Sequence, residues 1–464
     1  MNRDLLYDKK TGWDRLDDIG RQRMEELAGD YRRFLDRGKT ERDAVSALVE
    51  MAERKGFRPF ARGMEVKPGD RYYQVNRHKA VTLMVIGQRS LAEGISLTGA
   101  HLDAPRVDIR TVPLYEDSEM AFFKTHYYGG IKKYQWTTIP LELRGVVYTC
   151  DKEGNTGKVD VHIGQDPADP VFVITDLLPH LAGEQMRKTM MAGIPGESLN
   201  ILIGSEPDLT MKKEDGDRVK MQILQWLNRT YGIREEDFLS AELCAVPAFN
   251  AREVGFDRSL IGSYGHDDRV CAFSAAQALL DLEQTPDKTA MCLLVDREEV
   301  GSDGVTGMQS QQFDTLIADL CRAQQVLPQQ CLENSTCLSA DVANAYDPNY
   351  PDVSDTRNDA RLNCGLVITR HTGVRGKSDS SEASAELMAR VRSLFARAGV
   401  VWQTGELGKV DQGGGGTIAK YVANRNVDTV DAGVPVLSMH APFEVVSKLD
   451  LYMAYLGFLA FYNQ

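Results

Sequence analysis

The pattern of hydrophobic and polar positions changes twice along the chain. Residues 13–54 place apolar side chains three and four positions apart among charged ones, which predicts amphipathic helices. Short apolar runs follow at 72–76, 80–87 and 95–105, and their length predicts strands. The first hundred residues are therefore expected to form helices followed by strands.

The pattern differs in the next 150 residues. Short strand-like runs, such as 138–150 and 157–164, alternate with turn-rich pieces. This predicts a mainly-β domain over 106–254, either inserted or separate. Residues 1–105 and 255–464 would then form one discontinuous domain.

Beyond 255 the chain returns to an alternation of strands and helices. Helices are predicted at 271–284, 380–399 and 448–463, and buried strands at 289–302 and 434–442, each running into a loop. This alternation predicts an α/β fold, with a mixed sheet between helical layers.

The composition of the chain limits the binding partners and the cellular compartment that we expect. The chain has 464 residues with a formal net charge of −13, so we expect neither nucleic acid nor an anionic membrane as partner. It shows neither a signal peptide at its charged start nor an apolar run long enough to span a membrane. Eight cysteines without a C-x-x-C motif indicate reduced thiols, and we expect a cytoplasmic protein.

Five distant segments each place a metal-binding side chain beside small or turn-forming residues. They contain His101 with Asp103, Asp267 with Asp268, Glu298 with Glu299, Asp341, and His440. Each segment alone has an ordinary interpretation, such as a helix cap, a solvated acidic pair or a structural histidine. Their shared placement at strand ends favours one common site, because ligands collect where the strands of an open α/β sheet end. Two histidines and several carboxylates are the ligand set of a pair of divalent metals, with one carboxylate left as base.

Neighbouring residues suggest a division of roles within these segments. Asp103 lies two positions after His101 and can orient its imidazole. Of the adjacent Glu298 and Glu299, one would bind a cation and the other would move a proton. Asp341 lies in a small apolar stretch, where a cation or a buried arginine would have to compensate its charge.

A glycine loop at 411–417 lacks the sequence context of a nucleotide site. Its backbone N–H groups, including those of Gly415 and Gly416, could instead hold a carbonyl or carboxylate of a substrate near the metals.

Together with "GAHLDAPR", "YYGG", "PHLA", "SADVANAYDPNYP" and "SMHAPFE", these residues resemble the aspartyl aminopeptidase and vacuolar aminopeptidase I family of co-catalytic dizinc metallopeptidases. The resemblance spans nearly the whole chain. It implies one metal on His101, Asp267 and Asp341, a second on Glu299, His440 and the same Asp267, Glu298 as general base and Asp103 as orienting carboxylate. It also implies a cis peptide bond after Asp267. Zinc is the metal expected from the family, while cobalt and manganese accept the same ligands.

The resemblance also has consequences for assembly and substrate. It makes 106–254 a dimerisation domain and implies that His180, in "PHLA", reaches the active site of a neighbouring subunit. Relatives form tetrahedral dodecamers around an enclosed chamber, which implies short peptides with a free N-terminus as substrates.

Two departures from the family pattern bear on specificity. Asn344 and Asp347 stand where relatives carry histidines, and the segment after "GLVITR" is rewritten as "HTGVRGKSDSSEAS". A preference for an acidic first residue would need a positive charge in this region, which Arg375 or Lys377 could supply.

The sequence therefore predicts a metallo-aminopeptidase. One alternative is a related dizinc carboxypeptidase or N-acyl-amino-acid deacylase, which would need a guanidinium for the substrate's carboxylate. A second is a catalytically silent assembly scaffold, which would be free to lose Glu298.

Overall fold

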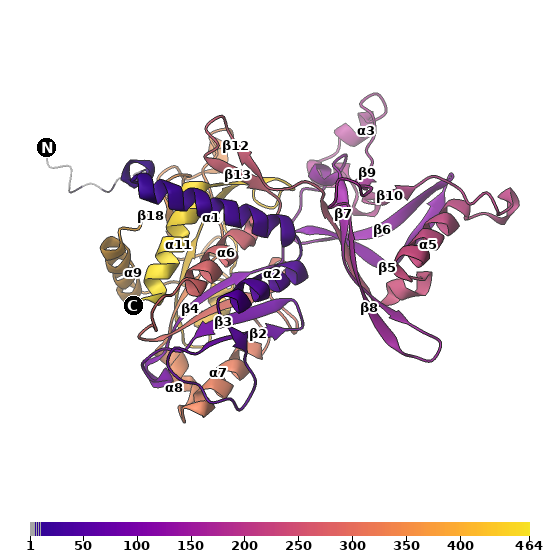
Figure 1. Ribbon diagram of the computed structural model, residues 1–464. Coiled ribbons are helices and arrows are strands. Elements are labelled where there is room, and N and C mark those ends of the chain that lie inside the picture. The colour runs from indigo at the N-terminus through magenta and orange to yellow at the C-terminus, as the bar shows by residue number, and fades with distance from the viewer. Residues whose placement is uncertain (1–4, 6, 8, 10) are drawn as a thin grey trace. The chain divides into compact units, whose positions relative to one another are not determined.

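The computed structural model describes residues 5, 7, 9 and 11–464, and the chain divides into two compact units (Figure 1). The first unit contains the residues up to Ala104, Ala251–Met439 and Phe443–Gln464. The second unit contains Pro105–Asn250 and the short piece His440–Pro442. The dimerising role expected of residues 106–254 stays a prediction.

A nine-stranded mixed sheet forms the centre of the first unit. Its strands, in spatial order, are β1 (Arg58–Pro59), β2 (Arg71–Asn76), β3 (Ala80–Val85), β14 (Thr289–Val295), β4 (Ile95–His101), β15 (Thr336–Ser339), β19 (Asp428–Gly433), β17 (Leu366–Thr369) and β18 (Trp402–Thr404). The four central strands, β14, β4, β15 and β19, pair in parallel, whereas β3 pairs antiparallel with β14 and β17 with β19. The predicted α/β fold with a mixed sheet is confirmed.

Both faces of this sheet are covered, because alternate side chains of a strand point to opposite faces. In β14, Cys292 and Leu294 belong to one hydrophobic cluster, while Met291 and Leu293 belong to another. The first cluster includes residues of α1 (Asp18–Arg37), α2 (Glu41–Arg54), α6 (His266–Leu280), α9 (Ala385–Ala398) and α11 (Lys448–Tyr462). The second includes residues of α7 (Gln312–Ala323), α8 (Pro328–Glu333) and α10 (Ala419–Ala423).

Local signals in the sequence fix where several of these helices begin. The side chains of Asp17, Thr40 and Ser384 each accept a backbone N–H in the first turn of α1, α2 and α9, which satisfies donors that have no partner within the helix. Gly38 ends α1, so the helical pattern predicted over 13–54 is divided mainly between two helices.

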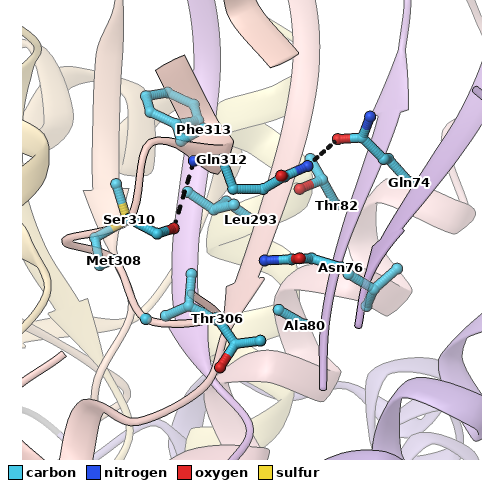
Figure 2. Close-up of a pocket in the computed structure, with 13 residues that line it drawn as sticks. Gln74, Asn76, Ala80, Thr82, Leu293, Thr306, Met308, Ser310, Gln312 and Phe313 are labelled. Atoms are coloured by element: carbon cyan, nitrogen blue, oxygen red, sulfur yellow. Dashed lines mark hydrogen bonds between the residues drawn. The ribbon is translucent and has the colours of Figure 1, made fainter. Parts of the chain in front are cut away.

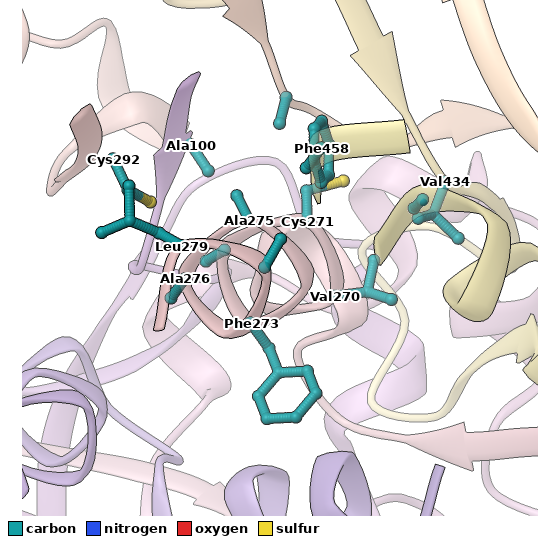
Figure 3. Packing of buried hydrophobic residues seen from close by; sticks show 14 of the residues in the cluster. Ala100, Val270, Cys271, Phe273, Ala275, Ala276, Leu279, Cys292, Val434 and Phe458 are labelled. Atoms are coloured by element: carbon teal, nitrogen blue, oxygen red, sulfur yellow. The ribbon is translucent and has the colours of Figure 1, made fainter. Parts of the chain in front are cut away.

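Helix α6 is buried on nearly all sides, and its first residues include Asp267 and Asp268. Figure 3 shows its small side chains, among them Ala275 and Ala276, packed close to neighbours that include Ala100 of β4 and Phe458 of α11. Small residues let α6 approach the sheet and α11 closely, and close packing restricts movement of its first turn.

A smaller five-stranded sheet completes the first unit. Its order is β12 (Arg252–Val254), β13 (Leu260–Ser263), β21 (Glu444–Ser447), β20 (Pro435–Leu437) and β16 (Ala343–Asn344). Strand β13 leads into α6, and β16 follows the end of β15 by a few residues.

The second unit is built on a seven-stranded antiparallel sheet. Its order is β8 (Thr156–Ile163), β7 (Leu141–Cys150), β11 (Ala241–Pro247), β5 (Arg106–Asp117), β6 (Met120–Tyr128), β10 (Ile201–Gly204) and β9 (Val173–Ile174). The unit also contains α5 (Arg218–Tyr231) and the short α3 (Gly183–Met186) and α4 (Met190–Gly193). Glu116 caps α5 by accepting the backbone N–H groups of Val219 and Lys220.

Within the described residues, none of the helices has the length and apolar character needed to cross a membrane. The eight cysteines all lie in the described part of the chain and are not joined in disulfide bonds, and Cys150 is the exposed one among them.

Candidate metal centre

His101 is the last residue of β4 and projects into a cluster of carboxylates. All seven residues of β4 are buried, and His101 is 1% exposed. Its Nε2 lies 3.2 Å from Asp267 Oδ1, 3.9 Å from Asp341 Oδ1 and 4.0 Å from Glu298 Oε2. This nitrogen therefore faces three acids that come from three other segments.

Asp103 holds the opposite side of the imidazole. Its Oδ1 lies 3.3 Å from His101 Nδ1, and its backbone carbonyl oxygen lies 3.0 Å from the same nitrogen. Its two carboxylate oxygens also accept the backbone N–H groups of Glu298 and Glu299, at 3.2 Å each. Asp103, which is fully buried, thus orients the ring and fixes the turn that carries both glutamates.

Glu298 and Glu299 lie in a tight turn immediately after a buried strand. The apolar strand β14 ends at Val295, and a 3-10 turn spans Glu298–Val300. The turn is closed by the backbone N–H of Ser302, which donates to the carbonyl of Arg297 at 2.7 Å. Both glutamates are half-buried, so this turn presents two carboxylates at the end of the sheet.

Asp267 and Asp268 lie at a kink near the start of α6, where both have non-helical backbone angles, and a cis peptide bond joins them, as the resemblance implied. The backbone N–H of Asp267 donates to Glu444 Oε2 at 3.0 Å. Asp268 Oδ2 accepts the backbone N–H of His101 at 3.2 Å. The pair is therefore tied both to β21 and to the end of β4.

Asp341 follows β15 by two residues and completes the cluster. One group of side chains contains His101, Glu298 and Asp341, and a second contains His101, Asp267 and Glu299; within each group the potential ligand atoms lie within 4.8 Å of one another. The structure thus brings together five residues predicted from the sequence. His101 is common to both groups, whereas the resemblance makes Asp267 the shared ligand; the division of ligands between two ions stays a prediction.

The electrostatics of the cluster fit a bound cation. Burial, together with the carboxylate of Asp268, raises the pKa of Asp341 well above its usual value. Burial also raises the pKa of Asp268. Burial alone would lower the pKa of His101, but Asp103 and Asp267 outweigh it and raise that pKa well above its usual value. The cluster therefore attracts positive charge, and its imidazole and carboxylate donors are those that zinc accepts.

The other predicted site residues lie outside these two groups. His440 belongs to the second unit, where its Nδ1 lies 2.8 Å from the carbonyl oxygen of Gly130. His180 is exposed in the same unit. Lys377 forms an ion pair with Glu382 at 3.0 Å. The metal, catalytic and substrate roles of these residues stay predictions.

Two loops that carry predicted substrate-binding residues are joined to each other in the first unit. The backbone N–H of Gly373 donates to the carbonyl of Gly415 at 2.6 Å, and both Gly415 and Gly416 are exposed. Arg375 is also exposed, at the tip of the segment that follows β17. The glycine loop runs into α10, and Ile418, which precedes that helix, lies against Gly99 of β4.

Sequence reasoning gave no role to two buried acids that hold this cluster. The sequence marks Asp268 only as the neighbour of Asp267, and it offers no spacing that reveals the bond that Asp268 accepts from the N–H of His101. Glu444 lies in "SMHAPFE", but its contact with Asp267 depends on the pairing of β13 with β21. His266, next to Asp267, is buried, with Nδ1 2.7 Å from the hydroxyl of Tyr31 and Nε2 3.1 Å from the carbonyl oxygen of Ile261.

A separate internal cavity lies between α7 and the strands β2, β3 and β14 (Figure 2). Its volume is about 20 Å³, and its lining includes Gln74, Asn76, Thr306 and Gln312. Gln312 donates to the side chain of Gln74 at 2.8 Å. This volume suits a single water molecule, so the cavity is too small for a peptide residue.

Comparison with known proteins gives consistent matches over the whole chain. The family described as "Aminopeptidase I zinc metalloprotease (M18)" matches residues 34–462. A Clostridium acetobutylicum protein named "Probable M18 family aminopeptidase 1" is 46% identical over 471 residues, covering 100% of both chains. The crystal structure of an M18 aminopeptidase from Thermotoga maritima has a TM-score of 0.92 at 41% identity and covers 99% of this chain and 100% of its own. The S. cerevisiae mApe1 dodecamer shares the fold, with a TM-score of 0.76 at 20% identity, covering 94% of this chain and 96% of its own.

Proposed function

The chain belongs to the M18 family of aminopeptidase I zinc metalloproteases, and on that basis we propose how its side chains act. The protein is a zinc metallo-aminopeptidase. The proposal is that it uses two divalent ions per subunit, with Glu298 as general base, to release the first residue of short peptides. The observation that carries the proposal is the convergence of one imidazole and four carboxylates from four segments of the first unit.

The residues proposed to hold the ions are those that the resemblance assigned. They are His101, Asp267 and Asp341 for one ion, and Glu299, His440 and the shared Asp267 for the other. Bound divalent ions would polarise the scissile carbonyl and lower the pKa of a water molecule. Asp103 supports this set because it orients His101 and holds the turn that contains Glu299.

Glu298 is proposed to move the proton. Its side chain is 17% exposed, and its Oε2 lies 4.0 Å from His101 Nε2, so the carboxylate borders the cluster and remains accessible to substrate. It would accept a proton from the attacking water and return it to the leaving amine. The backbone N–H of Glu298 donates to Asp103 Oδ1, which holds the backbone that carries this carboxylate.

The preference for the first residue of the substrate is proposed to depend on Arg375. Lys377 forms an ion pair with Glu382, whose Oε1 also lies 3.4 Å from Arg370 Nη2. Arg375, by contrast, has no ion-pair partner among the described residues and is exposed. It is therefore the cation proposed to favour an acidic first residue, and a panel of acidic, neutral and basic aminoacyl-nitroanilides would measure this preference.

Self-association is proposed to complete the enzyme. The segment around His180 exposes several large apolar side chains: Leu177, Leu178, Leu181, Met186, Met190 and Met191, each between 49% and 81% exposed. Such an apolar segment is typical of an interface. We propose that it packs against a second copy and brings His180 to that copy's active site, and that dimers build a tetrahedral dodecamer. The dodecamer of the yeast protein that shares this fold supports the proposal.

The cytoplasm is the proposed compartment, because reduced thiols persist there and the cysteines of the described chain form no disulfide bonds. The deacylase and scaffold alternatives gain no support from relatives that are named aminopeptidases.

One experiment tests the proposed activity directly. The purified chain is assayed on a short peptide with a free N-terminus and on its N-acetylated twin, before and after removal of metal by a chelator. We expect hydrolysis of the free-amine peptide alone, loss of activity on chelation, and recovery with zinc. Equal rates on both peptides, or full activity without metal, would contradict the proposal.

A further inference from the structure

A buried arginine lies immediately behind the candidate metal centre. Arg269 follows Asp267 and Asp268 on α6 and is 1% exposed, among the largest fully buried side chains of the chain. Removing a guanidinium from water costs several kcal/mol unless partners compensate it. Such a residue is retained only where its contacts serve the fold or the site.

The partners of Arg269 are backbone carbonyls. Its Nε donates to the carbonyl of Leu102 at 3.2 Å, and its Nη2 donates to the carbonyl of Lys39 at 3.1 Å. Its guanidinium also lies 5.4 Å from the centre of the Tyr264 ring. Within the described part of the chain, no carboxylate forms an ion pair with it, so its contacts differ from those of a surface salt bridge.

The backbone at Gly265 leaves room for this guanidinium. Gly265 has φ +77°, and a Cβ added there would lie 1.9 Å from Arg269 Nη1. Any side chain at 265 would therefore displace the arginine, as well as strain the backbone. The glycine at 265 thus leaves the space that the Arg269 guanidinium occupies.

The acceptor of the Nε bond links Arg269 to the metal ligands. Leu102 lies between His101, whose Nε2 faces the carboxylates, and Asp103, which orients the ring. A bond to the carbonyl of Leu102 restrains the peptide unit that joins Leu102 to Asp103, and through it the backbone next to His101. Because Arg269 also follows Asp267 on a closely packed helix, one side chain connects two of the segments that supply ligands.

We propose that Arg269 is a positioning residue for metal binding, which acts through the carbonyl of Leu102 to hold His101 and Asp103 against Asp267. This inference rests on the proposed function, because it assumes that the cluster binds metal. Groups that orient metal ligands in this way typically change metal affinity by about 10–100-fold when they are replaced.

Arg269→Lys is the principal test. Lysine keeps the positive charge, but its single ammonium group cannot span both carbonyls as the planar guanidinium does. We expect the zinc dissociation constant, measured by competition with a chromophoric chelator, to rise about 10–100-fold. The zinc concentration needed for half-maximal activity should rise equally, while the circular dichroism of the metal-free protein stays as in wild type.

Arg144→Lys is the matched control. Arg144 is equally buried, at 2% exposed, but lies in the second unit, where its Nε contacts Glu142 Oε1 at 2.5 Å. This variant should lower the melting temperature and leave the zinc dissociation constant unchanged.

Gly265→Ala provides a second route, because it displaces the guanidinium without changing its charge. If Arg269→Lys does not fold, the zinc dissociation constant of Gly265→Ala tests the positioning role instead. A wild-type zinc dissociation constant in the folded variant, with only a lower melting temperature as in Arg144→Lys, would overturn the positioning role. A wild-type protein that binds no zinc would instead refute the proposed function itself, so the two failures can be told apart.

Discussion

Two groups of buried charges, one in each unit, are compensated in different ways. In the second unit, Glu142 and Arg144 are both almost fully buried and form an ion pair with each other. In the first unit, buried and half-buried acids gather around the single imidazole of His101, and the pKa values of Asp341 and Asp268 rise. A charge compensated by its neighbour indicates a structural role, whereas a cluster of like charges indicates that a cation from outside is needed.

We expect the largest effect from replacing Glu298, the proposed general base of the candidate metal centre. Glu298→Gln should leave the zinc content and melting temperature near their wild-type values, because the ligands stay in place. It should lower kcat by about 10³-fold or more, since the general base is lost. Zinc per chain and turnover of an aminoacyl-nitroanilide, measured on the same preparation, check this. A variant with a near-normal rate would remove Glu298 from the role of base.

Glu142→Gln makes the matching change in the second unit. It removes the charge of Glu142 from the ion pair with Arg144, and breaking a buried ion pair costs about 3 kcal/mol. We expect a clear loss in the free energy of unfolding, followed by denaturant titration, with zinc per folded chain unchanged. If this variant lost zinc and kept its stability, the division of roles between the units would be wrong.

His180→Phe tests whether the second unit contributes to catalysis. An exposed side chain contributes little to folding, so stability and zinc content should stay near wild type. Activity should fall, by about tenfold, if the imidazole reaches a neighbouring active site; removal of a single stabilising donor costs this much or more. Mixing His180→Phe with Glu298→Gln subunits should restore part of the activity. Unchanged kinetics of His180→Phe would refute the contribution in trans.

A buried charge can also be compensated when the group binds a proton, and Asp450 is an example. This buried carboxyl in α11 accepts the backbone N–H groups of Asn363 and Gly365 at 2.7 Å each, and burial raises its pKa to about 8. Because the folded pKa exceeds the ordinary value of about 3.9, the folded state binds the proton more tightly. Its contribution to stability is complete below pH 4 and is lost as the pH rises towards 8.

Asp450→Asn should remove this pH dependence. In wild type, the free energy of unfolding should fall by about 1 kcal/mol per pH unit between pH 5 and pH 8 from this group. The free energy of unfolding of variant and wild type is measured by denaturant titration at pH 5, 6, 7 and 8. The difference between the two isolates the contribution of Asp450. A difference that does not change with pH would show that Asp450 is already ionised in the folded state.

Much of the fold and part of the candidate site could be predicted from the sequence. Local patterns predict helices over 13–54 and buried strands that lead to His101 and Glu298. The structure has helices and strands in these places. The joint site could be inferred because strand ends of an α/β sheet converge. The supporting contacts could not be inferred, because they depend on pairings between distant segments. Glu444 meets Asp267 only through the register of β13 with β21, and Arg269 meets Leu102 only once α6 packs on the sheet.

The most direct test of the account is anomalous diffraction at the zinc edge from crystals of the wild-type enzyme. The account predicts two peaks about 3.5–4 Å apart, the usual spacing of paired catalytic metals. One should lie on His101 and Asp341, the other on Glu299 and His440, with Asp267 between them and Glu298 bound to neither. A single peak, or a peak coordinated directly by Glu298, would contradict the assignment of two ions and a free general base.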